Sequence, residues 1–168
     1  IRGDHSDLYF ALNTGWLILL ARDPQAVYDM NVVALRLGER PEVRLPAIVA
    51  FDGFFTSHQK RRVRYFGDER VVQDFLGPVP ECVNALDPRN PVTIGPYMND
   101  PDLINNKYQL KLAMDAAQRA LPEVFAEYEA RSGRHYDLVD LYRMEDAEIA
   151  VLLLNSAAET AKDAVDRL

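Results

Sequence analysis

Side chains able to do acid–base or metal chemistry are concentrated near the start of the chain, in Gly3-Asp4-His5-Ser6-Asp7. Two carboxylates, an imidazole and a hydroxyl lie in this segment, a set that could bind a metal ion, transfer protons or form a buried hydrogen-bond network. The same residue types also form polar turns that cap helices. The spacing therefore leaves both the chemical and the structural interpretation open.

A second polar cluster, Asp52, Thr56, Ser57 and His58, follows the nearly continuous apolar run Leu45–Phe51. A run of this kind predicts a parallel strand that is buried on both faces. Ligands of open α/β sheets usually bind at the carboxyl ends of such strands. The position of this cluster therefore predicts a functional neighbourhood.

The pair Ser57-His58 could suggest a nucleophile beside its base. Adjacent side chains rarely meet with the geometry that this chemistry needs, and the pair lacks the flanking glycines of a G-x-S-x-G turn. We expect Ser57 and His58 instead to cap a turn or to contact a ligand at the strand end.

Four cations follow this pair closely: Lys60, Arg61, Arg62 and Arg64. Such a run could bind phosphate or RNA. In a chain of net charge −7 we favour a solvated face or a subunit contact. His135, which lies in a later connecting segment, is expected to be structural.

Composition limits the classes of function. Hydrophobic residues make up 48% and charged residues 27%, as in soluble globular proteins. The 26 acidic against 19 basic residues disfavour binding to nucleic acid or to anionic membranes. The most apolar stretches, Leu17–Ala21 and Ile149–Leu154, are too short to span a bilayer. We expect no nucleic-acid partner and no membrane.

The chain has one cysteine, Cys82, so it can hold neither an internal disulfide nor an iron–sulfur cluster on its own thiolates. This cysteine content fits a reducing, cytoplasmic location. Its eight glycines form neither G-x-G-x-x-G nor a P-loop, and no histidine or cysteine set has zinc spacing. We predict no metal site within the chain.

Periodicity predicts an α/β organisation. Residues Asp7–Ala21 are expected to form a helix, or a helix followed by an apolar segment with Trp16–Leu20 largely buried. Asp23-Pro24 and the apolar spacing predict an amphipathic helix over Pro24–Leu37, ended by Gly38. The other expected elements are a helix at Asp68–Leu76, a loop at Gly77–Pro101, a helix at Asp102–Arg131 interrupted at Pro122, a connector at Gly133–Arg143, a strand at Ala147–Leu154 and a helix at Ser156–Leu168.

Several short motifs, in this order, resemble the α chain of the pyruvate:ferredoxin (2-oxoacid:acceptor) oxidoreductase family. They are Gly3-Asp4-His5-Ser6-Asp7, Thr14-Gly15-Trp16, Asp52-Gly53-Phe54 with Thr56-Ser57-His58, Gly133-Arg134-His135-Tyr136, Glu145-Asp146-Ala147-Glu148 and Ser156-Ala157-Ala158-Glu159-Thr160-Ala161. The chain begins at Ile1 rather than Met, and we expect it to be a fragment of such an α subunit.

The resemblance implies a thiamin-diphosphate-binding fold with a mostly parallel sheet and flanking helices. Residues 1–133 would be the C-terminal part of the pyrimidine-binding domain. Residues 134–168 would begin a transketolase-C-terminal-like α/β domain. The implied reaction is oxidative decarboxylation of a 2-oxoacid, in which thiamine diphosphate acts as the electron sink.

The resemblance also implies cofactors and partners. Thiamine diphosphate and Mg²⁺ would be shared with another subunit or domain, 4Fe-4S clusters would lie on other chains, and coenzyme A would be a co-substrate. The partners would be a β subunit carrying the diphosphate-binding domain, a γ subunit, a ferredoxin-like δ subunit and ferredoxin or a similar acceptor, in a hetero-oligomer.

The family's catalytic glutamate, threonine and arginine precede the first motif, so no catalytic residue is expected in this chain. The expected supporting residues are Asp4, His5 and Asp7 near the substrate pocket, with Asp52, Thr56, Ser57 and His58 at the strand end. The pair Leu12-Asn13 and the basic run after His58 depart from the pyruvate enzymes, so oxalate or phenylglyoxylate is an alternative substrate. A non-catalytic interaction subunit that keeps the fold is the alternative function.

Overall fold

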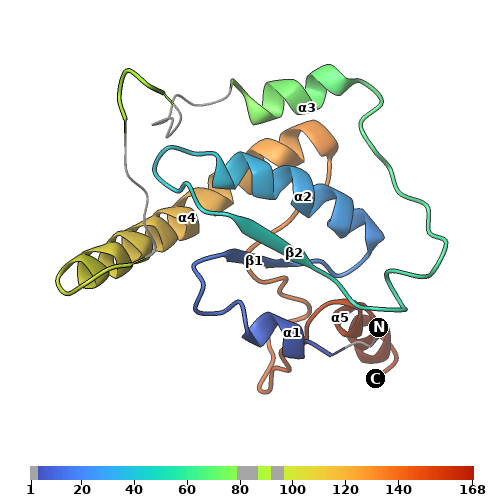
Figure 1. The fold of residues 1–168 in the computed structure, drawn as a ribbon. Helices are drawn as coiled ribbons and strands as arrows, with labels where there is room; N and C mark the ends of the chain where they lie inside the picture. Colours follow the sequence, from blue (N-terminus) through green and yellow to red (C-terminus); the bar gives the residue numbers. More distant parts are fainter. Residues whose placement is uncertain (1–3, 79–86, 92–96) are drawn as a thin grey trace.

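The computed structural model describes residues 4–78, 87–91 and 97–168, and Cys82 lies outside these ranges. Its helices and strands follow one another in the order shown in Figure 1. They are α1 (Ser6–Tyr9), β1 (Leu17–Leu20), α2 (Pro24–Gly38), β2 (Ala47–Ala50), α3 (Glu69–Leu76), α4 (Asp102–Ser132) and α5 (Ser156–Val165).

Strands β1 and β2 form a small parallel sheet and α2 connects them. The register pairs Leu17 with Ala47 and Leu20 with Ala50. Asp23 begins α2, because its side chain accepts a hydrogen bond from the Ala26 backbone N–H at 2.7 Å. The predicted helix and the predicted parallel strand are therefore confirmed. Burial of the strand on both faces is not, since β2 is only partly buried within the described chain.

Gly38 is required for a different reason from the expected one. It is the last residue of α2, and Glu39 caps the helix in the right-handed conformation. A Cβ atom at Gly38 would lie 2.7 Å from the Leu45 carbonyl oxygen. The glycine thus permits close approach of the helix end to the chain that enters β2.

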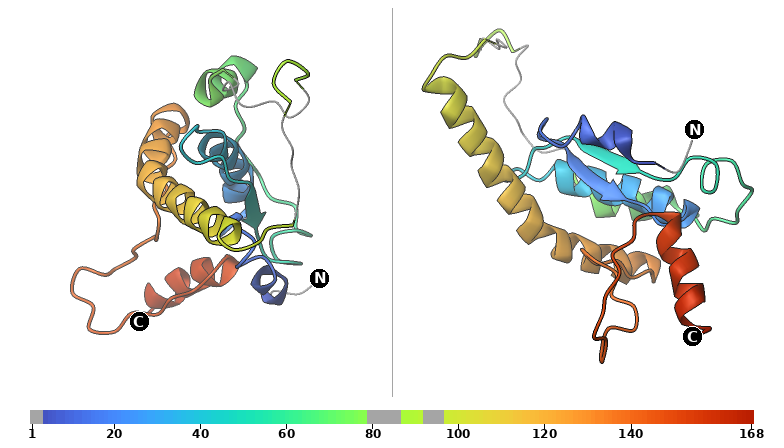
Figure 2. Two further views of the ribbon diagram at one scale, coloured as in Figure 1. Left: turned by 60° about the vertical axis from the view of Figure 1, so that its left-hand side comes forward. Right: turned by 90° about the horizontal axis from the view of Figure 1, so that it is seen from below.

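The hydrophobic core lies between α2, α3 and α4, whose packing Figure 2 shows from two further sides. Its largest fully buried side chains are Tyr128, Phe75, Leu37, Val33 and Val124. The helix predicted at Asp68–Leu76 is confirmed as α3, and Asp68 caps it by accepting the Arg70 backbone N–H at 3.0 Å.

The expected interruption of the long helix at Pro122 is wrong, because α4 continues from Asp102 to Ser132 and bends along its length (Figure 2). Pro122 is exposed, whereas the neighbouring Leu121, Val124 and Phe125 are buried in the core. Packing of that apolar face outweighs the hydrogen bond that proline removes. Gly133, in the left-handed conformation at φ 68°, ends the helix.

Of the two arrangements expected for Asp7–Ala21, the structure has the helix followed by an apolar segment: the short α1 precedes strand β1, with Gly15 at φ 89° between them. Trp16 and Leu20 are more exposed than expected. The segment Ala147–Leu154 forms no strand, and Ile149, Val151 and Leu152 are exposed. A strand needs a partner edge, and the described residues provide none to this segment.

The final predicted helix is confirmed as α5, which begins at the carboxyl end of the strands (Figure 1). Part of the predicted loop Gly77–Pro101 lies outside the described residues, and its described parts contain no helix or strand. Across the described ranges, no helix is both long enough and apolar enough to cross a membrane.

Candidate functional site at the carboxyl ends of the strands

Asn155 connects α5 to both strands. Its side chain is almost fully buried, and Nδ2 donates to the carbonyl oxygens of Ala21 at 2.8 Å and Ala50 at 3.1 Å. Ala21 follows β1 directly and Ala50 is the last residue of β2. One amide group therefore binds the carboxyl ends of both strands.

Asp52 lies beside Asn155 and caps α5. Its side chain is 7% exposed, and Oδ2 accepts the Ser156 backbone N–H at 2.7 Å. A carboxylate at this position is stabilised by the positive end of the helix dipole. The cluster Asp52, Thr56, Ser57 and His58 thus begins with a residue that positions a helix more than a hundred residues later.

His5 completes this arrangement from the other end of the chain. Its Nε2 is hydrogen-bonded to Asn155 Oδ1 and lies 3.9 Å from Asp52 Oδ1. Because Asn155 Nδ2 donates to two carbonyl groups, the amide oxygen faces His5 and accepts. The hydrogen-bond network therefore assigns the imidazole proton to Nε2. We call His5, Asp52 and Asn155 the strand-end cluster.

The strand-end cluster joins three segments that are far apart in the sequence, including two of the motifs that carry the family resemblance. One acid, one imidazole and one amide meet at the strand ends, where ligands of α/β sheets bind. The cluster can hold a proton at Nε2 of His5 and fix the orientation of the loops that follow β1 and β2. Its own hydrogen bonds already use most of its polar atoms.

The other expected residues near the start of the chain are more exposed. Asp4 Oδ1 accepts from the Ser6 backbone N–H at 3.1 Å and from Ser6 Oγ at 2.7 Å. Asp7 lies in the first turn of α1 with an exposed side chain. Asp4 thus stabilises the turn that carries His5.

Ser57 and His58 do meet, contrary to the sequence expectation: Ser57 Oγ lies 2.6 Å from His58 Nδ1. Ser57 Oγ also accepts the Phe54 backbone N–H at 2.9 Å, and the His58 ring stacks on Phe54. Both residues are exposed, and no carboxylate orients His58 among the described residues. The pair stabilises a turn, as expected, and lacks the third group of a catalytic triad.

Thr56 lies apart from this pair. Its side chain is 8% exposed and borders a pocket beside α5. Of the seven expected residues, the structure therefore brings His5 and Asp52 together, places Thr56 in an adjacent pocket and leaves the other four on the surface.

A second buried network surrounds Asp29, which sequence reasoning missed. Its carboxylate accepts from Arg134 Nε at 2.7 Å and Nη2 at 2.9 Å, from Tyr128 Oη at 2.7 Å and from Tyr136 Oη at 2.5 Å. Burial raises the pKa of Asp29, but the hydrogen bonds from Arg134, Tyr136 and Tyr128 outweigh it and hold the pKa below its usual value. The network binds the segment after α4 to α2.

The sequence carried signals for both missed residues. Asp29 is an acid on an otherwise apolar helix face, between Ala26, Met30 and Val33. Such a residue is buried only when it is paired. Asn155 stands directly before a helix, after an apolar run. Its backbone has φ 52° and ψ −137°, outside the left-handed helical region, so the residue type alone does not signal this conformation.

Comparison with known proteins agrees with these motifs. Residues 1–126 match the family model described as pyruvate flavodoxin/ferredoxin oxidoreductase, thiamine diphosphate-binding. The chain therefore belongs to this thiamine-diphosphate-binding oxidoreductase family, which confirms the resemblance.

The chain is also similar, over nearly its whole length, to individual oxidoreductase subunits. The chain is 39% identical over 168 residues to the pyruvate synthase subunit PorA of Thermotoga maritima, and 35% identical over 167 residues to that of Pyrococcus horikoshii. It is 33% identical over 174 residues to the alpha subunit of NADH-dependent phenylglyoxylate dehydrogenase of Aromatoleum evansii. These matches cover 98–100% of this chain but only 41–43% of each relative, so the chain spans less than half the length of these relatives.

Proposed function

We propose that the protein containing this chain is the α subunit of a thiamine-diphosphate-dependent 2-oxoacid oxidoreductase that decarboxylates its substrate oxidatively. The observation that carries the proposal is the match along the whole chain to subunits of pyruvate synthase and phenylglyoxylate dehydrogenase. The meeting of His5 and Asp52 at the strand ends supports it, because both residues belong to motifs that this chain shares with the family.

The described residues do not by themselves form a binding site for thiamine diphosphate and Mg²⁺. No group of three or more histidine, cysteine, aspartate or glutamate side chains among them could hold a metal ion. Asp52 and Asn155 are occupied by hydrogen bonds within the chain. We therefore assign the direct contacts to the cofactor, and the 4Fe-4S clusters, to parts of the enzyme outside this chain.

When bound, thiamine diphosphate supplies the electron sink that holds the pair of electrons released by decarboxylation. The residues of this chain position the loops around the strand ends. Asn155 and Asp52 fix the loops at the strand ends, and His5 holds the first motif against them. Asp4 and Asp7 belong to the segment that carries His5, and Thr56, Ser57 and His58 belong to the loop that follows β2.

The substrate class is a 2-oxoacid with a small or aryl substituent. The relatives bear the names of a pyruvate enzyme and a phenylglyoxylate enzyme. We propose that the chain is shared between a pyrimidine-binding domain, up to about residue 133, and the start of a transketolase-C-terminal-like domain. The β, γ and ferredoxin-like δ subunits would complete a cytoplasmic hetero-oligomer, with coenzyme A as co-substrate and ferredoxin or a similar acceptor.

The test uses the intact native complex. Anaerobic viologen reduction is followed with pyruvate, 2-oxoglutarate, oxalate and phenylglyoxylate, each with and without coenzyme A. We expect reduction with one of these acids. A requirement for coenzyme A would indicate acyl transfer, and no requirement would indicate release of carbon dioxide only.

A non-catalytic interaction subunit is the competing function. It predicts a complex that assembles but contains no thiamine diphosphate and reduces no viologen with any acid. Quantifying thiamine diphosphate in the purified complex separates the two functions, because an enzyme that lacks only its correct substrate would still contain the cofactor.

A further inference from the structure

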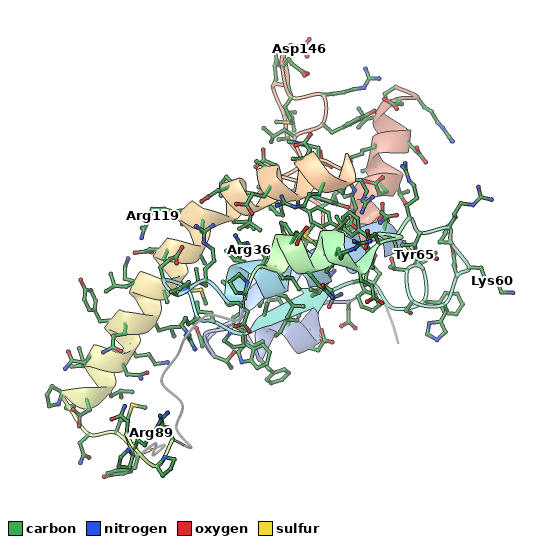
Figure 3. The ribbon with its side chains drawn as sticks, turned by 90° about the horizontal axis from the view of Figure 1, so that it is seen from above. Arg36, Lys60, Tyr65, Arg89, Arg119 and Asp146 are labelled. Atoms are coloured by element: carbon green, nitrogen blue, oxygen red, sulfur yellow. The ribbon has the colours of Figure 1, made fainter. Side chains whose placement is uncertain are left out.

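A pocket of about 410 Å³ lies between the start of α2, the loop that follows β2 and the first turn of α5. Arg22, Thr56, Arg61, Arg62, Ser156 and Thr160 are among its lining residues. Figure 3 shows Lys60, on the same loop, projecting outward at the edge of the molecule. The basic run after His58 therefore divides, with Arg61 and Arg62 lining the pocket and Lys60 pointing away.

Two guanidinium groups in this pocket carry uncompensated charge. Within the described ranges, neither Arg61 nor Arg62 forms an ion pair with a carboxylate, and Arg61 Nη2 donates only to Gln59 Oε1, at 2.5 Å. By contrast, Arg22 Nη1 lies 2.6 Å from Asp140 Oδ2. Both residues are exposed, and two guanidinium groups without a counter-charge give the pocket a positive potential that favours a negatively charged occupant.

The acidic groups that line the pocket do not compete strongly for these cations. Asp23 Oδ1 accepts the Ala26 backbone N–H at 2.7 Å as the cap of α2. Glu159 Oε1 accepts from Lys162 Nζ at 2.9 Å. Each carboxylate thus already has a partner of positive charge or partial positive charge.

Thr56 gives a second, independent indication. It is 8% exposed and lines the pocket, yet its hydroxyl makes no hydrogen bond to any residue that the structure describes. The hydroxyl oxygen itself is accessible to solvent, so it is open to a ligand in the pocket. A hydroxyl beside two free guanidinium groups is a donor placed for an anion with several acceptor oxygens.

We propose that this pocket binds a phosphate group, of inorganic phosphate or of a phosphomonoester. The planar guanidinium groups of Arg61 and Arg62 match phosphate oxygens through paired hydrogen bonds, and Thr56 adds a third donor. The positive end of the α5 dipole adds to the field. Since Asp52 occupies the Ser156 backbone N–H, side chains rather than that amide hold the phosphate.

The proposal is tested on the intact complex by arginine modification with phenylglyoxal, and the rate at each arginine is measured by peptide mass spectrometry. Reaction in chloride is compared with reaction in inorganic phosphate, in adenosine 5′-monophosphate and in acetate, all at one ionic strength. At a ligand concentration ten times the dissociation constant, we expect modification of Arg61 and Arg62 to slow about tenfold. Arg64, in the same run but outside the pocket lining, is the internal control and should react at an unchanged rate.

The variant Thr56→Val keeps the side-chain volume and removes the hydroxyl. Losing one hydrogen bond to a charged group should raise the dissociation constant about tenfold and reduce the protection to about twofold. The matched control Lys60→Gln, which removes a charge of the same run outside the pocket, should leave the protection unchanged. Protection by inorganic phosphate alone would assign the free ion, and stronger protection by the nucleotide would assign a phosphomonoester.

The proposal would be overturned by equal rates in chloride and phosphate, by equal protection by acetate, or by equal protection of Arg64. Failure of Arg61 and Arg62 to react in chloride would also overturn it, because the pocket would then be closed in the complex. The readout is binding, so it does not depend on which 2-oxoacid the enzyme uses.

Discussion

Arg134 donates two hydrogen bonds to the buried carboxylate of Asp29, from Nε at 2.7 Å and from Nη2 at 2.9 Å. This pair joins α2 to the segment that follows α4. The Arg134 guanidinium also lies over the rings of Phe66 and Tyr128. The family motif Gly133-Arg134-His135-Tyr136 therefore has a structural role, in which both Arg134 and Tyr136 bind the same acid.

The substitution Asp29→Asn tests this role. It leaves the guanidinium of Arg134 in a largely buried site without its counter-charge, which in proteins costs about 3–5 kcal/mol. We expect a large fall in the urea midpoint of the purified α subunit. The control Asp166→Asn removes the partner of Arg143 in an exposed pair and should leave the midpoint unchanged. Equal midpoints for wild type and Asp29→Asn would show that the network contributes nothing to stability.

The same carboxylate predicts a dependence of stability on pH. Its pKa is lower in the folded chain than its ordinary value of 3.8, so the unfolded chain binds the proton more readily. Stability from Asp29 is therefore fully present above the unfolded pKa and is lost as the pH falls through the lower folded pKa. Urea midpoints measured from pH 6 down to pH 3 should fall more steeply for the wild type than for Asp29→Asn. Parallel curves would contradict the assignment.

We expect the substitution Asn155→Asp to lower both the stability and the turnover of the enzyme. In Asn155→Asp, a carboxylate oxygen would replace the donor that faces the carbonyl oxygens of Ala21 and Ala50, and a second negative charge would lie beside Asp52. Leaving buried acceptors without a donor costs about 1–3 kcal/mol, and the added charge costs more. We expect a lower urea midpoint and at least a tenfold loss of viologen reduction in the assembled enzyme.

The variant Asn155→Gly separates the role of the Asn155 side-chain amide from that of its backbone conformation. Asn155→Gly tolerates the positive φ of 52° and loses only the hydrogen bonds, so it should lie between the wild type and Asn155→Asp in both measurements. If the glycine variant matches the wild type, backbone conformation rather than the amide is what the position requires.

Local signals in the sequence were sufficient for most helices. The cap Asp23, Pro24 and the apolar spacing define α2 within one residue of its observed end. Local signals left two arrangements open for Asp7–Ala21, because pairing with β2 decides that the apolar segment Leu17–Leu20 is a strand. They failed for Ala147–Leu154, because a strand needs a partner that no local pattern specifies.

The residues of the candidate site were likewise found where local patterns were sufficient and missed where distant contacts decide. The motifs near His5 and Asp52 were found because polar residues cluster within a few positions of each other. Asn155 and Asp29 were missed because their roles depend on contacts with residues far away in the sequence, such as Ala21 and Arg134. Single-sequence patterns report neighbours along the chain and not those across the fold.

The substitution Asp4→Ala tests whether the turn before α1 positions His5. Its carboxylate accepts two hydrogen bonds from Ser6 and so stabilises the turn that presents His5 to Asn155. Asp4→Ala removes both hydrogen bonds, and a loss of about 1 kcal/mol in positioning corresponds to about a fivefold lower turnover. Subunit assembly, measured by size-exclusion chromatography, should not change, because Asp4 is exposed and is not part of the hydrophobic core. Asp4→Asn, which keeps an acceptor oxygen, should recover most of the turnover, whereas full activity of Asp4→Ala would mean that the turn holds His5 without this carboxylate.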